Sequence, residues 1–275
     1  EGIPFYTEEI IRMLIAEGGL SKRDGGWQIT STADALLRRV PGTLQGLILA
    51  RFDRSEELPR RVLQAAAVIG RSFPAGLIQT LFNTSHDQLE DCFADLEARQ
   101  FLAPQPFGSA QGYAFRHVLI QEAVYSTLLR RDRRRFHERV AAAIEASTYW
   151  PPAEKNEVLS YHYSQSTKPA RAIPFLMVAA EHADRRCANE TASRHYRQAI
   201  ELMEACPDSS LEDLYAASTG LGRALKFVGE LQEASQVLTE TLEQISRQET
   251  VCAKWASIDA LRELADVRAR EGDYD

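Results

Sequence analysis

From residue 150 onward the chain is patterned as helices alone, and this feature constrains the fold most. Helix-length apolar patterns succeed one another at about residues 153–166, 170–187, 190–206, 211–228, 231–247 and 251–270. Gly229, in one of the turns, recurs 43 residues later as Gly272. Helix pairs repeated at a steady interval are typical of solenoids, in which each pair buries its apolar face against its neighbours. We therefore predict an α-solenoid over residues 150–275, with Pro174 beginning or kinking its helix.

A second pattern precedes the solenoid. Helical patterns at about residues 58–69, 74–82 and 87–99 are followed by short strand patterns at 101–103 and 113–116. Ser85 is placed to cap the third helix, and Gln88 completes the capping-box spacing. Three helices followed by a two-stranded wing is the element order of a winged helix. We predict such a module over residues 58–149.

A winged helix suggests DNA binding, but the charges of its third helix oppose that function. This helix carries five acidic side chains, and the loop over residues 105–112 has no lysine or arginine; the acids are Asp87, Glu90, Asp91, Asp95 and Glu97. Phosphate contacts usually dominate affinity for DNA, so this helix would be repelled. The net charge of −7 acts in the same direction. We therefore expect no nucleic-acid partner.

One basic cluster follows the wing. It consists of Arg130, Arg131, Arg133, Arg134, Arg135 and Arg139. Two interpretations stay open: a solvated helix face with its aliphatic stems on apolar surface, or a docking surface for an acidic partner.

Residues 1–57 form a separate opening segment. A helix is predicted at about residues 6–17, with Ile10, Ile11, Leu14 and Ile15 facing inward and Gly18-Gly19 ending it. A strand over 27–30 and a helix over 43–52 follow. The chain begins abruptly and ends inside an unfinished repeat, so we expect it to be part of a longer protein at both ends.

His117 lies where a predicted strand runs directly into a helix. Tyr113 and Phe115 alternate with Ala114 and Arg116, and helical spacing takes over afterwards. A histidine that caps a helix N-terminus lies beside free N–H groups and the positive end of the dipole, which is a natural setting for an anion. The alternative is a histidine hydrogen-bonded within its own hairpin.

No complete catalytic motif is present, and no metal site is predicted. The chain lacks G-x-x-x-x-G-K-[ST], H-E-x-x-H and G-x-S-x-G, and its four cysteines show no C-x-x-C spacing. The longest apolar runs, such as residues 65–69, are too short to cross a membrane. We expect a cytoplasmic protein with reduced cysteines.

Three segments together resemble the C-terminal part of the STAND-class (AAA-like) signalling ATPases. Residues 2–10 (GIPFYTEEI) resemble the family's G-x-P-F-(F/Y)-x-E-E-(L/I) lid segment. Residues 63–73 (LQAAAVIGRSF) resemble its L-x-x-A-A-V-I-G-R-x-F segment, and residues 115–125 (FRHVLIQEAVY) resemble its F-R-H-x-L-x-x-E-A-x-Y element. Members are fused to class III adenylate/guanylate cyclases, serine/threonine kinases or large transcriptional regulators.

The resemblance implies a lid segment over residues 1–57, a winged helix over 58–149 and TPR-like repeats over 150–275. It implies nucleotide contacts at Gly2, Pro4, Arg116 and His117, the proline lying against adenine and the histidine holding the β-phosphate of ADP. ATP or ADP with Mg²⁺ would be bound by an ATPase core upstream of residue 1, and this part alone would bind none. A partner protein would bind the repeats. The alternatives are a repeat scaffold with no nucleotide role and, disfavoured by its charges, a DNA-binding regulator.

Overall fold

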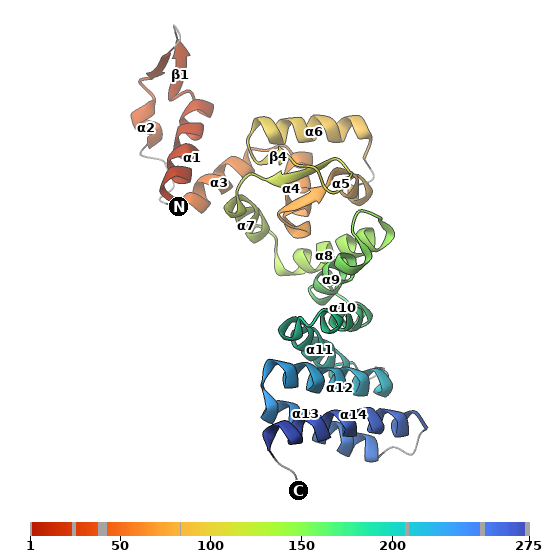
Figure 1. Ribbon diagram of the computed structural model, residues 1–275. Helices are drawn as coiled ribbons and strands as arrows, with labels where there is room; N and C mark the ends of the chain where they lie inside the picture. The colour runs from red at the N-terminus through yellow and green to blue at the C-terminus, as the bar shows by residue number, and fades with distance from the viewer. Residues whose placement is uncertain are drawn as a thin grey trace. The chain divides into compact units, whose positions relative to one another are not determined.

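The computed structural model describes residues 2–23, 26–37, 43–82, 84–206, 209–247 and 251–272, with only the backbone for residues 2–4, 23, 153 and 251–255. The fold is mainly α-helical with two small antiparallel sheets, which confirms the predicted fold class (Figure 1). The chain divides into two compact units, Glu1–Phe136 and His137–Asp275. The division falls inside one helix, whereas the sequence pattern changes at residue 150, and the domain bounds drawn from that pattern stay a prediction.

The first unit opens with α1 (Gly2–Ala16), the hairpin β1 (Leu20–Arg23) and β2 (Gly26–Ile29), and the helices α2 (Ala33–Leu37) and α3 (Leu44–Asp53). Helix α1 begins earlier than predicted, because proline is tolerated in the first turn of a helix. Its predicted inward face was half wrong: Leu14 is buried, but Ile11 and Ile15 are 44% and 40% exposed. Gly18, with φ +74°, ends the helical turn as expected.

The part of the chain predicted to be a winged helix contains one strand more than expected. Its elements are α4 (Glu57–Ile69), β3 (Ser72–Pro74), α5 (Ala75–Phe82), α6 (His86–Ala98), β4 (Leu102–Pro104) and β5 (Gly112–Phe115). Strand β5 lies between β3 and β4 and is antiparallel to both. The predicted cap is confirmed, since the Ser85 hydroxyl accepts a hydrogen bond from the Gln88 N–H at 3.4 Å.

Aromatic rings hold helix α6 on this sheet. Phe93 stacks on Tyr113 at 4.1 Å between ring centroids, and Phe73 lies 6.5 Å from Phe93. All three side chains are buried. They fix the sheet from which β5 leads into the next helix, α7 (Val118–Ser126).

Helix α8 (Arg130–Ala146) carries the arginine cluster, and one member is held within the protein. The Arg133 guanidinium lies 4.1 Å from the Tyr125 ring centroid and donates hydrogen bonds to the carbonyl oxygens of Tyr125 and Leu128. The other members are exposed: Arg130, Arg131, Arg134, Arg135 and Arg139. The two interpretations of the cluster therefore apply to the exposed members and not to Arg133.

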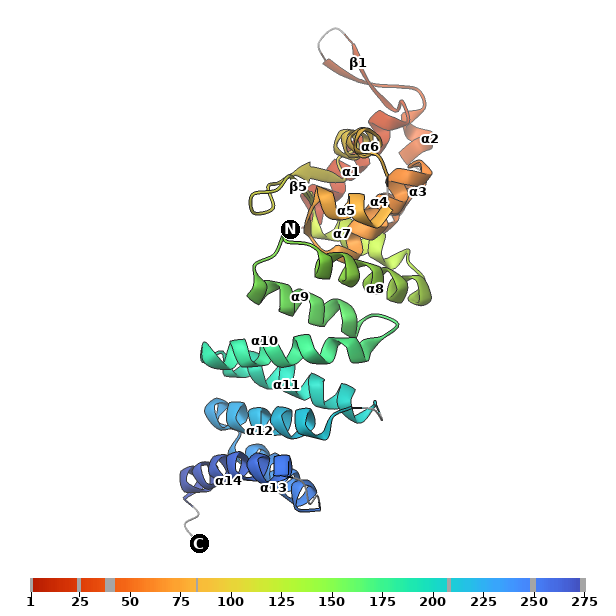
Figure 2. The same ribbon diagram turned by 90° about the vertical axis from the view of Figure 1, so that its right-hand side faces the viewer.

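The second unit is a row of helices in which each helix packs on the next. It contains α9 (Pro152–Ser164), the 3-10 turn η1 (Pro169–Ala172), α10 (Ile173–Arg185), α11 (Asn189–Glu204), α12 (Leu211–Val228), α13 (Leu231–Ser246) and α14 (Val251–Glu271) (Figures 1 and 2). Pro174 begins α10 and does not kink it. Gly229 and Gly272 both have left-handed φ angles, +97° and +83°, so the repeated glycine serves the same turn geometry twice.

Two further glycines let helix α12 approach its neighbours closely. A Cβ atom on Gly220 would lie 2.5 Å from the Tyr196 ring of α11. A Cβ atom on Gly222 would lie 2.5 Å from Leu238 of α13. Both distances are too short for a real contact. Helix α12 can therefore lie this close to α11 and α13 only because glycine has no side chain at these two positions.

Candidate functional site

His117 caps helix α7, as the sequence predicts. Its backbone is extended, with φ −143° and ψ 144°, and its Nδ1 atom accepts a hydrogen bond from the Leu119 N–H at 3.2 Å. Since Nδ1 acts as the acceptor, the neutral ring carries its proton on Nε2. No described residue accepts a hydrogen bond from that nitrogen. The half-buried imidazole therefore has one N–H donor free at the N-terminus of a helix.

The structure brings two of the resemblance motifs together at this histidine. The Phe5 ring stacks on the His117 ring with 4.3 Å between centroids and 14° between planes. Phe5 belongs to the motif over residues 2–10, which is far from His117 in the sequence. Gly2 and Pro4 lie in the first turn of α1, where the structure describes only the backbone.

Arg116 is the residue directly before the cap, and the nucleotide contact that the resemblance implies for it stays a prediction. Its backbone N–H donates to the Phe101 carbonyl, and its exposed side chain donates from Nε to the Leu102 carbonyl at 3.4 Å. The side chain is thus turned toward strand β4. No described contact joins it to His117.

A buried ion pair on the same helix α1 was not predicted. Glu9, one turn after Phe5, is 2% exposed, and its Oε2 atom lies 2.7 Å from Nη1 of Arg51 in α3. The Arg51 guanidinium also lies 4.2 Å from the Phe101 ring centroid. Its Nε and Nη2 atoms are buried and have no hydrogen-bond partner in the described part of the chain. Burial lowers the pKa of Arg51, and Glu9 opposes that shift.

One face of α1 therefore contacts both His117 and Arg51. The spacing of Phe5 and Glu9 at i and i+4 would have put them on one face, but nothing in the sequence named Arg51 as the partner. The free Nε2–H of His117 favours an anionic ligand over a cationic one, whereas the unpartnered Arg51 nitrogens are buried.

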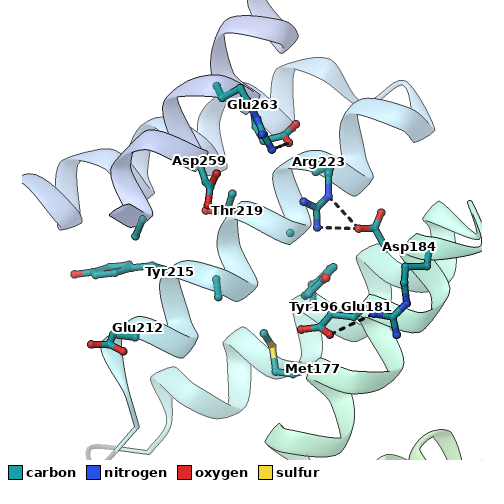
Figure 3. Close-up of a pocket in the computed structure, with 15 residues that line it drawn as sticks. Met177, Glu181, Asp184, Tyr196, Glu212, Tyr215, Thr219, Arg223, Asp259 and Glu263 are labelled. Carbon is teal, nitrogen blue, oxygen red and sulfur yellow. Dashed lines mark hydrogen bonds and ion pairs between the residues drawn. The ribbon is translucent and has the colours of Figure 1, made fainter. Parts of the chain in front are cut away.

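The second unit contains a cavity of about 540 Å³ that was also not predicted (Figure 3). Its walls come from α10, α11, α12 and α14. The lining mixes apolar side chains with several carboxylates. In the described ranges, no three side chains of the His, Cys, Asp and Glu types are placed to hold a metal, and Cys92, Cys187 and Cys206 are free thiols.

Comparison with known proteins finds a similarity to part of a longer protein. No family model matches the chain, and no solved structure matches it. An uncharacterized protein of Rhizobium meliloti (strain 1021) is 27% identical over 192 residues, which is 68% of this chain and 19% of that protein. The chain therefore spans about a fifth of a much longer relative. None of the helices in the described ranges is long and apolar enough to span a membrane.

Proposed function

We propose that this chain is the regulatory, nucleotide-sensing and protein-interaction part of a larger STAND-class signalling ATPase. The observation that carries the proposal is the stacking of Phe5 on His117, because it joins two motifs that a nucleotide would have to contact together. The free Nε2–H at a helix N-terminus suits a phosphate oxygen. The length of the relative agrees with a parent protein of several domains.

In this proposal the chain senses nucleotide but performs no chemistry on it. ADP bound to an upstream core would receive a hydrogen bond from His117 Nε2 and contacts from the Gly2–Pro4 turn, with Mg²⁺ and the phosphate-binding loop supplied by that core. Arg116, the exposed residue before the cap, would add a cation beside the phosphates. A ligand shifts a two-state equilibrium only by its differential affinity for the two states. Contacts made only in the ADP-bound state would therefore hold the protein inactive.

The helical repeats would hold or release a cytoplasmic partner protein. The output would be a cyclase, a kinase or transcription, carried elsewhere in the parent chain. The rival function is a repeat scaffold that binds a partner without any nucleotide role. Partner affinity that changes between ADP and ATP supports the switch, and equal affinity supports the scaffold.

The first test is the coding sequence upstream of residue 1. The proposal expects a G-x-x-x-x-G-K-[ST] motif after an apolar strand pattern, followed by a strand that ends in acidic residues. If neither motif is encoded there, the nucleotide-switch proposal fails and the scaffold replaces it.

A further inference from the structure

The cavity between helices α10, α11, α12 and α14 has an unbalanced set of charges. Five carboxylates line it, Glu181, Asp184, Glu212, Asp259 and Glu263, against three arginines, Arg185, Arg223 and Arg262. Each arginine is already in an ion pair. Arg223 lies 2.8 Å from Asp184, Arg262 lies 3.4 Å from Glu263, and Arg185 lies 3.8 Å from Glu181. The described lining therefore offers no free cation to an anionic ligand.

Two carboxylates and one hydroxyl remain available. Glu212 and Asp259 are exposed and have no ion-pair or hydrogen-bond partner in the described part of the chain. Thr219 is only 8% exposed, and its hydroxyl has no described hydrogen-bond partner either. Its oxygen is not one of the fully buried atoms without a partner, so it reaches the space of the cavity and can pair with a ligand there.

These groups come from two helices and line the same cavity. Glu212, Tyr215 and Thr219 follow at i, i+3 and i+7 on α12, which places them on one helix face. Asp259 enters the same cavity from α14 (Figure 3). Met177, Tyr215 and Ala216 add apolar surface beside the carboxylates.

We propose that this cavity binds an arginine side chain presented by a polypeptide partner. A guanidinium has several N–H donors in a plane and suits a carboxylate together with a hydroxyl acceptor, as Asp259 and Thr219 offer side by side (Figure 3). Glu212, two turns away on α12, adds negative charge to the same lining. Its alkyl stem would lie on the apolar surface, and the exposed position of Glu212 and Asp259 leaves the polypeptide backbone in solvent. The inference rests on the proposed function for the idea of a partner on the repeats, and it adds the chemistry of that partner.

The test is calorimetric titration of this chain with the blocked peptide Ac-Gly-Gly-Arg-Gly-Gly-NH2. A matched peptide with citrulline in place of arginine keeps the shape and removes the charge. We expect the arginine peptide to bind at least about tenfold more tightly than the citrulline peptide, and to weaken as salt is raised. Equal binding of the two peptides, or no binding of either, overturns the inference.

Paired variants locate the binding. Glu212→Gln with Asp259→Asn should weaken the arginine peptide about tenfold. The control is Glu201→Gln with Asp213→Asn, which removes the same two charges from exposed positions on α11 and α12 outside the cavity lining, and it should leave affinity within about twofold. Equal weakening by both pairs would mean attraction to overall charge and would refute the site.

A further titration distinguishes an arginine in a polypeptide from a free guanidinium compound as the ligand. Agmatine carries the guanidinium without a peptide backbone and should bind several-fold more weakly than the peptide; tighter binding of agmatine would assign the cavity to a free small molecule. None of these titrations includes a nucleotide. Their failure would therefore leave the ADP-sensing proposal standing, and loss of that proposal would leave a positive peptide result intact.

Discussion

At the scale of single residues, the second unit is tied together by a buried charge. Lys226 of α12 is 6% exposed, and its Nζ lies 2.6 Å from Glu263 and 2.7 Å from Asp266 of α14. Glu263 is itself 5% exposed. A charge at such depth is tolerated because its partners are in contact, so removing Lys226 leaves the buried Glu263 with only the exposed Arg262, at 3.4 Å, among the described residues.

Replacing Lys226 with methionine should therefore lower the free energy of unfolding by about 3–5 kcal/mol. Urea denaturation followed by circular dichroism measures the change. The double variant Lys226→Met with Glu263→Met should recover most of the loss, since no buried charge is left alone. A single-variant loss below about 1 kcal/mol would show that Glu263 keeps enough solvent or other partners without the lysine.

Tyr163 contributes stability to the second unit that is lost at alkaline pH. The side chain is fully buried and stacked on Phe175, and its hydroxyl donates a hydrogen bond to Glu145. Burial, followed by the neighbouring Glu145, raises the pKa of Tyr163 to about 12. The unfolded chain releases this proton near pH 10, so the contribution is complete below about pH 10 and is lost as pH rises toward 12.

The expected result is that wild type loses more stability than Tyr163→Phe when pH is raised from about 9 to about 11. Denaturant midpoints at the two pH values measure it. Cys92, whose pKa burial also raises to about 12, is present in both proteins and cancels in the comparison. Parallel losses in the two proteins would remove Tyr163 from the pH dependence.

At the scale of elements, the close packing of helix α12 on its neighbours depends on its glycines. Gly222→Ala should destabilise the second unit by about 1–3 kcal/mol, because the added methyl group would overlap Leu238 of α13. Alanine has the higher helix propensity by up to about 1 kcal/mol, so propensity alone predicts the opposite sign. Thermal unfolding decides between the two effects, and a stabilised variant would mean that α13 moves away at little cost.

Elements with strong local signals were the ones that the sequence predicted best. Helix α12 matches the predicted bounds because Ser210 caps its first turn and Gly229 adopts a left-handed φ at its end. Strand β3 was missed because three residues ending in Pro74 carry no alternation that can be recognised. On α1, apolar Ile11 and Ile15 match a helical stripe, yet this part of the chain leaves them exposed.

The candidate sites were predicted only where one segment contains the signal. His117 could be assigned as a cap from the change of period around it. The Arg51–Glu9 pair joins two helices, and the cavity proposed to bind arginine is lined by Glu212 and Asp259 from helices that are not adjacent in sequence. Contacts between residues of different helices are set by tertiary packing, and a local sequence pattern does not predict them.

At the scale of the whole molecule, the distribution of charge opposes DNA binding. Asp87, Glu90 and Asp91 are exposed on α6, and the net charge is −7. We expect no binding to duplex DNA in fluorescence anisotropy at about 0.15 M salt, since few phosphate contacts are available. Affinity that rises steeply as salt is lowered would contradict this and would point to the exposed arginines of α8.

The proposed switch would act in the parent protein, and histidine variants separate it from local stability. His117→Asn keeps a side-chain acceptor at the helix cap, whereas His117→Ala removes both the cap and the imidazole. Alanine should therefore cost about 1 kcal/mol of stability that asparagine largely retains. Any effect shared by the two variants belongs to the imidazole.

The most direct measurement is the Kd for ADP of the parent protein, carrying its upstream core, in wild type, His117→Asn and His117→Ala. If His117 Nε2 donates to a phosphate oxygen, both variants should bind ADP about tenfold or more weakly, which corresponds to loss of one hydrogen bond to a charged group. Unchanged ADP affinity in His117→Asn would contradict a nucleotide-sensing role and leave His117 as a helix cap alone.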